Sequence, residues 1–129
     1  MTRIRVPGGL DRPHGVAIDR RGRLLVAEDS RRVRRIDPTT GRVALVTDRV
    51  DTNRIAVGHA GTLFLAGSTL NGGSLRRLDP GSRPSILLDD LHVSDVAVLA
   101  DGSLVITAVE PGAVYRVNAR TGARTKLTG

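Results

Sequence analysis

The chain has 129 residues, 40% of them hydrophobic and 26% charged, a globular composition that argues against a disordered or collagen-like protein. It has no cysteine, which excludes disulfide scaffolds, thiolate zinc sites and cysteine nucleophiles. Its 20 basic and 13 acidic residues give a net charge of +7. Without a signal peptide or an apolar run of about 20 residues, we expect one soluble domain over residues 1–129, no membrane insertion, and the cytoplasm as the default location.

The first repeat unit, residues 13–50, consists of four short apolar runs separated by turn residues, which is typical of β-strands. The second run is apolar at consecutive positions, so both faces of that strand are expected to be buried. Gly22 ends the first turn, where glycine adopts a positive φ without steric cost, and Asp37 and Pro38 begin the last turn. The predicted strands are 15–18, 24–27, 33–36 and 43–47.

Residues 53–93 and 94–129 repeat this pattern. The equivalent residues Ala17, Ala56 and Ala97 lie about 40 residues apart. Four-stranded antiparallel sheets with this period, buried on both faces, are typical of β-propeller blades. Residues 1–12, with Ile4 and Val6, are predicted to be the outer strand of a preceding blade and the loop that follows it.

The segment PHGVAIDRRGRLLVAEDSRRVRRIDPTTG, residues 13–41, resembles an NHL repeat. It is similar to blades of the gluconolactonase/regucalcin-type and virginiamycin-B-lyase-type six-bladed propellers. The resemblance covers nearly the whole chain and implies an all-β fold of three blades, half or a fragment of a six-bladed propeller. It implies no single activity, because this fold occurs in sensors, scaffolds, hydrolases and lyases.

Three blades do not close a propeller, because closed propellers have about 4–8 blades. Either the sequence is a piece of a longer propeller, or two copies associate into a six-bladed ring. An open three-blade solenoid is the third alternative, and it is less favoured because the last unit has no polar capping face: Leu104, Val105 and Ile106 are apolar.

The candidate site lies at the mouth of the propeller channel. In a blade, the loop that enters the first strand lies on the same face as the loop that leaves the second strand, so polar residues in these loops are expected to converge and bind a ligand. The predicted ligand-binding residues are His14, Glu28, Asp29, Asn53, Ser94 and Asp95. No residue is assigned a catalytic role.

A divalent cation such as Ca²⁺ is the cofactor considered, with Glu28, Asn53 and Asp95 as candidate ligands, because carboxylate and amide oxygens suit it. The resemblance to gluconolactonase-like proteins implies an ion near this face. The glutamate that those proteins carry at the entrance of the first strand would fall on His14, a departure from their metal site.

The function we favour is a noncatalytic NHL-type binding or scaffold module that contacts a protein or small molecule through its channel face or rim. The alternative is half of a metal-dependent, lactonase-like hydrolase or of a lyase, with an active site completed by other blades. Nucleic-acid binding beyond nonspecific electrostatic attraction is not expected, because no aromatic residue lies within the arginine cluster of the first unit.

Overall fold

The computed structural model describes residues 5–6, 8–69, 72–110 and 112–128, and throughout these ranges the regular secondary structure is β-strand. The strands form three four-stranded antiparallel sheets, each in chain order. Blade 1 contains β1 (Pro13–Ile18), β2 (Leu24–Glu28), β3 (Arg32–Ile36) and β4 (Val43–Asp48). Blade 2 contains β5 (Arg54–Val57), β6 (Leu63–Thr69), β7 (Gly72–Leu78) and β8 (Ser85–Leu88). Blade 3 contains β9 (Val93–Val98), β10 (Leu104–Ala108), β11 (Ala113–Val117) and β12 (Arg124–Thr128).

The predicted all-β fold of three four-stranded sheets is confirmed, and the predicted strands of the first unit all lie within observed ones. Local turn chemistry explains the agreement. Gly22, which ends the β1–β2 turn, has a φ of 79°. In the β3–β4 turn, the Asp37 carboxylate accepts hydrogen bonds from the backbone N–H groups of Thr39 and Thr40, at 2.8 and 3.2 Å.

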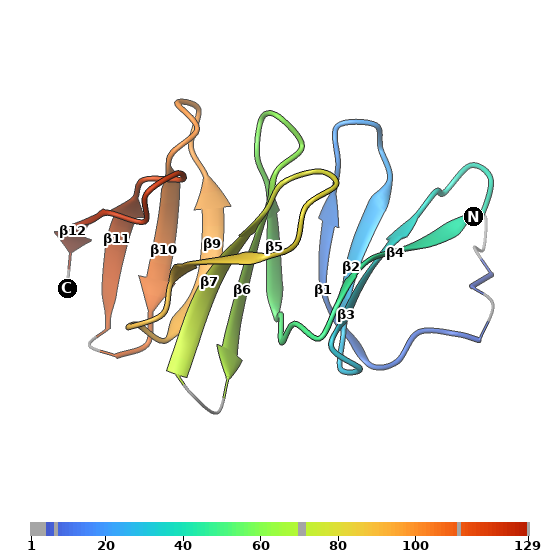
Figure 1. Ribbon diagram of the computed structural model, residues 1–129, viewed down its shortest axis with the longest axis horizontal. Coiled ribbons are helices and arrows are strands. Elements are labelled where there is room, and N and C mark those ends of the chain that lie inside the picture. Colours follow the sequence, from blue (N-terminus) through green and yellow to red (C-terminus); the bar gives the residue numbers. More distant parts are fainter. Residues whose placement is uncertain (1–4, 7, 70–71, 111, 129) are drawn as a thin grey trace.

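The three sheets stand side by side in a row, with blade 1 and blade 3 at opposite ends and blade 2 between them (Figure 1). The first strands of the blades, β1, β5 and β9, run in the same direction, and each contacts the next. Of the predicted strand in the leader, Ile4 lies outside the described residues and Val6 lies outside any strand. Assignment of the leader to a preceding blade therefore stays a prediction.

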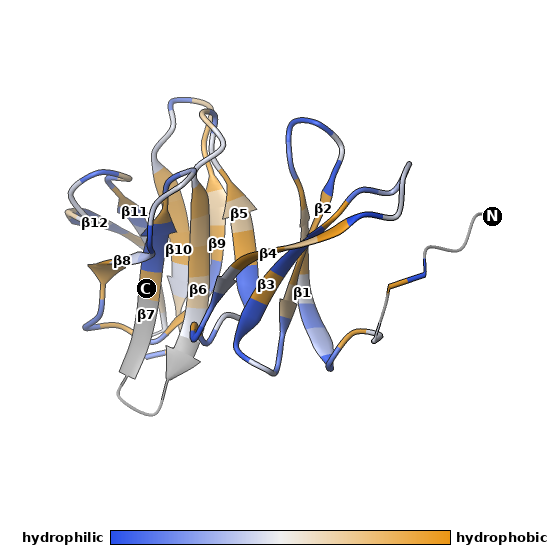
Figure 2. Ribbon diagram, turned by 45° about the vertical axis from the view of Figure 1, so that its right-hand side comes forward, coloured by the Kyte–Doolittle hydropathy of each residue, from blue (hydrophilic) through white to orange (hydrophobic). Residues whose placement is uncertain are grey.

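Two hydrophobic cores hold the row together, one in each space between blades. Side chains such as Leu25 from blade 1 and Leu65 from blade 2 form the first core. Phe64 from blade 2 and Ile106 from blade 3 contribute to the second. Hydrophobic residues follow the strands, whereas the turns are hydrophilic (Figure 2). The middle strand of blade 2, β6, buries residues on both faces, because Leu65 contributes to the first core and Phe64 to the second. The same burial predicted for the second strand of the last unit is wrong, since Val105 is half-buried and Thr107 is exposed in β10.

In the described part of the chain, the outer face of blade 1 is exposed along β1. Val16, Ile55 and Val96 occupy the same register position in the first strands of the three blades. Ile55 and Val96 are 9% and 8% exposed, since each packs against the preceding blade, whereas Val16 is 66% exposed. Ile18, on the same face of β1, is 65% exposed.

Candidate functional site

His14 and Asp29 lie in contact at one end of blade 1. His14 is in β1, Asp29 follows β2, and the distance from His14 Nε2 to Asp29 Oδ1 is 3.0 Å. Arg12 Nη1 is 3.7 Å from the other carboxylate oxygen of Asp29. His14 Nδ1 is buried without a hydrogen-bond partner. The loop that enters β1 and the loop that leaves β2 are thus adjacent, and their side chains pair with each other.

Glu28, the last residue of β2, is the most buried of the predicted site residues, with a side chain that is 0% exposed. Its carboxylate accepts hydrogen bonds from Arg34 at 2.6 and 2.9 Å. The backbone N–H of Asp11 donates a further hydrogen bond at 2.7 Å, and Arg32 Nη2 lies 3.6 Å away. Protein donors therefore occupy both oxygens of Glu28, which stabilises the blade and leaves the carboxylate little capacity for a ligand.

The burial of Glu28 follows from the path of the chain between blades. Glu28, Gly67 and Ala108 occupy equivalent positions in the second strands, and Glu28 and Ala108 are the last residues of theirs. At Gly67, a Cβ atom would lie 2.0 Å from the backbone oxygen of Asp51, so the segment entering β5 crosses directly over this position. In blade 1, the segment entering β1 crosses Glu28 in the same way, through Asp11. The small residues of the other units are the sequence signal that Glu28 is covered.

The balance of forces on Glu28 lowers the pKa of its carboxyl group below the ordinary value of 4.5. Burial is the largest single influence and acts to raise the pKa. The Arg34 hydrogen bonds, the Asp11 N–H and the charges of Arg34 and Arg32 together outweigh it. Glu28 is therefore a stable carboxylate at neutral pH and is not suited to act as a general acid.

Asn53 lies at the entrance of β5, where Arg54 joins blades 1 and 2. Arg54 Nη1 donates hydrogen bonds to the backbone oxygens of His14, at 3.1 Å, and Asn53, at 3.0 Å. Arg54 is absent from the residues predicted from the sequence. The repeat could have pointed to Arg54, because it aligns Arg54 with Asp95, which is a predicted site residue, and with Gly15.

Ser94 and Asp95, at the start of β9, make contacts within blade 3. Ser94 Oγ lies 2.8 Å from Thr107 Oγ1, and Asp95 Oδ1 accepts the N–H of Val96 at 2.8 Å. Within the described ranges, neither residue has a hydrogen bond or ion pair to the predicted site residues of blades 1 and 2. The six predicted residues thus form separate local groups.

The predicted cation ligands of this chain do not by themselves fit a divalent ion. The oxygens of Glu28 are already hydrogen-bonded, and Asn53 and Asp95 belong to different blades. Among the residues that the structure describes, no three histidine, aspartate or glutamate side chains lie close enough to hold a metal ion. A calcium site that uses these residues therefore requires ligands from other blades, and it stays a prediction. In the described ranges, no helix has the length and apolarity needed to cross a membrane.

No protein-family model and no curated protein sequence matches the chain. Solved structures do match. A gluconolactonase from Xanthomonas campestris is 21% identical, with 90% of this chain and 48% of that chain covered and a TM-score of 0.76. The virginiamycin B lyase from Staphylococcus aureus, in complex with quinupristin, is 14% identical, with 91% and 41% covered and a TM-score of 0.74. A nidogen/laminin complex matches at 15% identity, with 94% and 49% covered and a TM-score of 0.76.

This chain spans about half the length of the structures it matches. At these identities the likeness establishes the fold alone. It places the three sheets as blades of a β-propeller like those of gluconolactonase-like proteins, and it agrees with a partial propeller.

Proposed function

We propose that this chain, which has the fold of three β-propeller blades, is a noncatalytic binding or scaffold module that works as part of a closed ring, and that a second copy closes the ring. The observation that carries the proposal is the exposure of Val16 at 66%, against 9% for Ile55 and 8% for Val96 at the same register position. The strand face that is buried in β5 and β9 is thus exposed in β1 within the described structure.

The repeat itself indicates what covers this face. In both inner contacts, the first strand of one blade packs on residues from the second strand of the blade before it. No blade follows blade 3 in the part of the chain that the structure describes, and the equivalent surface of blade 3 includes Val105, which is only half-buried. A second copy would present this surface to Val16 and Ile18, and two sets of three blades give six, within the usual range of about 4–8. Burial of apolar area would drive the association.

Light scattering after size exclusion, over a range of concentrations, tests the association. We expect a mass of twice 13.7 kDa. The double variant Val16→Lys, Ile18→Lys is expected to be monomeric, because charged side chains would be buried in the contact. Ile86→Lys is the matched control, since Ile86 is 59% exposed on outer strand β8, and it is expected to remain dimeric. A monomer for the unmodified chain at all concentrations would contradict closure by a second copy.

The noncatalytic part of the proposal is supported by the pairing of Glu28 with Arg34 and of His14 with Asp29. We expect Ca²⁺ at about 1 mM, a concentration that fills weak protein calcium sites, to leave the melting temperature unchanged. A rise in melting temperature that is lost in Asp95→Asn, but kept in the control Asp48→Asn on the exposed part of β4, would instead favour a composite metal-dependent site. The measurement is a thermal melt of the associated species.

A further inference from the structure

An open groove of about 900 Å³ lies between blades 1 and 2, at the end of the blades opposite to His14. Residues of the β1–β2 loop and Arg35 of β3 form the wall on blade 1, and the β7–β8 turn contributes to the wall on blade 2. Leu25, Leu63 and Leu78 adjoin the groove but are buried in the core, and the partly buried Val46 provides accessible apolar surface. Its size falls within the range of about 300–1,000 Å³ that is typical of small-molecule sites.

The groove carries an excess of positive charge. Four arginines line it, against two aspartates, and both aspartates are already paired. Asp19 accepts a hydrogen bond from Arg23 Nε at 2.8 Å, and Asp79 pairs with Arg77. In the part of the chain that the structure describes, the side chains of Arg21 and Arg35 have neither a hydrogen bond nor an ion pair. The four arginines are Arg20, Arg21, Arg23 and Arg35.

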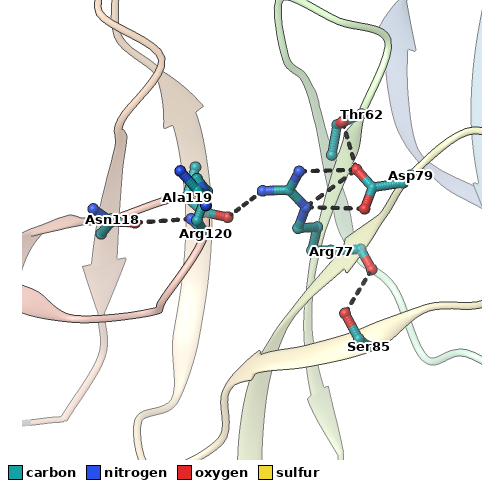
Figure 3. Close-up of polar contacts among 7 residues, drawn as sticks. All are labelled: Thr62, Arg77, Asp79, Ser85, Asn118, Ala119 and Arg120. Atoms are coloured by element: carbon teal, nitrogen blue, oxygen red, sulfur yellow. Dashed lines mark hydrogen bonds and ion pairs between the residues drawn. The ribbon is translucent and has the colours of Figure 1, made fainter.

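Arg35 differs in this respect from its equivalents in the other blades. Arg35, Arg77 and Arg116 occupy the same register position in the third strands. Arg77 pairs with Asp79 at 3.0 Å and also donates a hydrogen bond to the backbone oxygen of Ala119 at 2.7 Å, so it bridges blades 2 and 3 (Figure 3). Arg116 pairs with Asp101.

In blade 1, the aspartate at the position that would pair with Arg35 makes other hydrogen bonds. Asp37 is the counterpart of Asp79, but its carboxylate accepts hydrogen bonds from backbone N–H groups of its own turn. Arg35 is thus a partly buried guanidinium without a counter-charge within the described ranges. The arginines that do bridge blades 1 and 2, Arg20 and Arg54, bond to the backbone oxygens of His59 and His14 and leave Arg35 unpaired. A partly buried charge is unfavourable until it is paired, and a guanidinium binds carboxylate or phosphate oxygens through two parallel hydrogen bonds.

We propose that the groove between blades 1 and 2 binds a small organic anion, whose phosphate or carboxylate pairs with Arg35 and Arg21 and whose apolar body lies against Val46 at the edge of the core. This inference is independent of the proposed ring closure, because both walls belong to one chain. It also differs from nucleic-acid binding, which would use a continuous basic surface with aromatic stacking.

Isothermal titration calorimetry with phenyl phosphate and inorganic phosphate tests the proposal. We expect phenyl phosphate to bind more tightly than inorganic phosphate, because only its ring reaches the apolar residues. Arg35→Gln is expected to weaken phenyl phosphate binding about tenfold, through loss of a charge-assisted hydrogen-bond pair. Arg42→Gln is the matched control. Arg42 is exposed on the same blade, has no side-chain partner within the described ranges and does not line the groove, so its loss should leave affinity unchanged.

Arg35→Lys provides a second test if Arg35→Gln alters folding. It keeps the charge but loses the two-pronged hydrogen bonding, so we expect intermediate affinity. Equal weakening by Arg35→Gln and Arg42→Gln would overturn the proposal, because it would indicate diffuse attraction. A dissociation constant above about 10 mM for phenyl phosphate would overturn it as well. Arg35-dependent binding of an oligothymidine that excludes phenyl phosphate would assign the groove to nucleic acid instead.

Discussion

Replacement of Glu28 by alanine is expected to lower the free energy of unfolding by about 3–5 kcal/mol at neutral pH. The side chain of Glu28 is 0% exposed and that of its partner Arg34 is 11% exposed, so the variant leaves a nearly buried guanidinium without a counter-charge. The backbone N–H of Asp11 also loses its acceptor. Urea denaturation monitored by circular dichroism would measure the change.

Asp29→Ala is the matched control, because it removes the adjacent carboxylate, which is 45% exposed. Exposed ion pairs contribute little, so the expected loss is below about 1 kcal/mol. The double variant Glu28→Leu, Arg34→Leu should recover much of the stability lost in Glu28→Ala, since no charge then remains unpaired. Equal losses for Glu28→Ala and Asp29→Ala would show that the buried pair does not stabilise blade 1.

The same pair predicts a dependence on pH. Because the pKa of Glu28 is lower in the folded chain than its ordinary value of 4.5, the pair contributes its full stabilisation above that value. The contribution is lost as the pH falls through the lower folded pKa. The unmodified chain should therefore lose more stability on acidification than Glu28→Ala does, and the difference isolates Glu28 from carboxylates common to both proteins. Parallel losses would contradict the lowered pKa.

Replacement of Phe64 by alanine is expected to lower the free energy of unfolding by about 3–5 kcal/mol, through the cavity left in the core between blades 2 and 3. Phe64 is 3% exposed and belongs to that core. In repeat architectures each unit contacts only its neighbours, so the effect should be concentrated in blade 3. Hydrogen exchange should show greater loss of protection in β9–β12 than in β1–β4.

Leu127→Ala serves as the control for Phe64→Ala. Leu127 is 54% exposed in the outer strand β12, so its truncation is expected to change stability by less than about 0.5 kcal/mol. Uniform loss of protection over all three blades in Phe64→Ala would argue against separate cores between the blades and in favour of a single cooperative unit.

Part of the candidate site could be predicted from the sequence. The repeat correctly brings the loops of His14 and Asp29 together, because the hairpin topology alone fixes which loops share an end of the blade. Glu28 and Arg34 lie on the same face of adjacent strands, as Arg34 is opposite Val26, two residues before Glu28. The pairing of Glu28 with Arg34 could therefore be predicted once the hairpin register was known. The sequence could not predict that the backbone N–H of Asp11 donates a hydrogen bond to this carboxylate.

The sequence by itself determined the architecture: an antiparallel sheet repeated three times, with its strands and turns. Glycines at positive φ, such as Gly22, and aspartate-capped turns, such as that of Asp37, act over a few residues, so their effect does not depend on distant contacts. Tertiary structure alone decided which charges are satisfied by a neighbouring blade. Arg77 finds an acceptor 42 residues away in the next blade, whereas the equivalent Arg35 finds none in the described chain. Such differences arise because pairing depends on the spacing between blades, which no local pattern encodes.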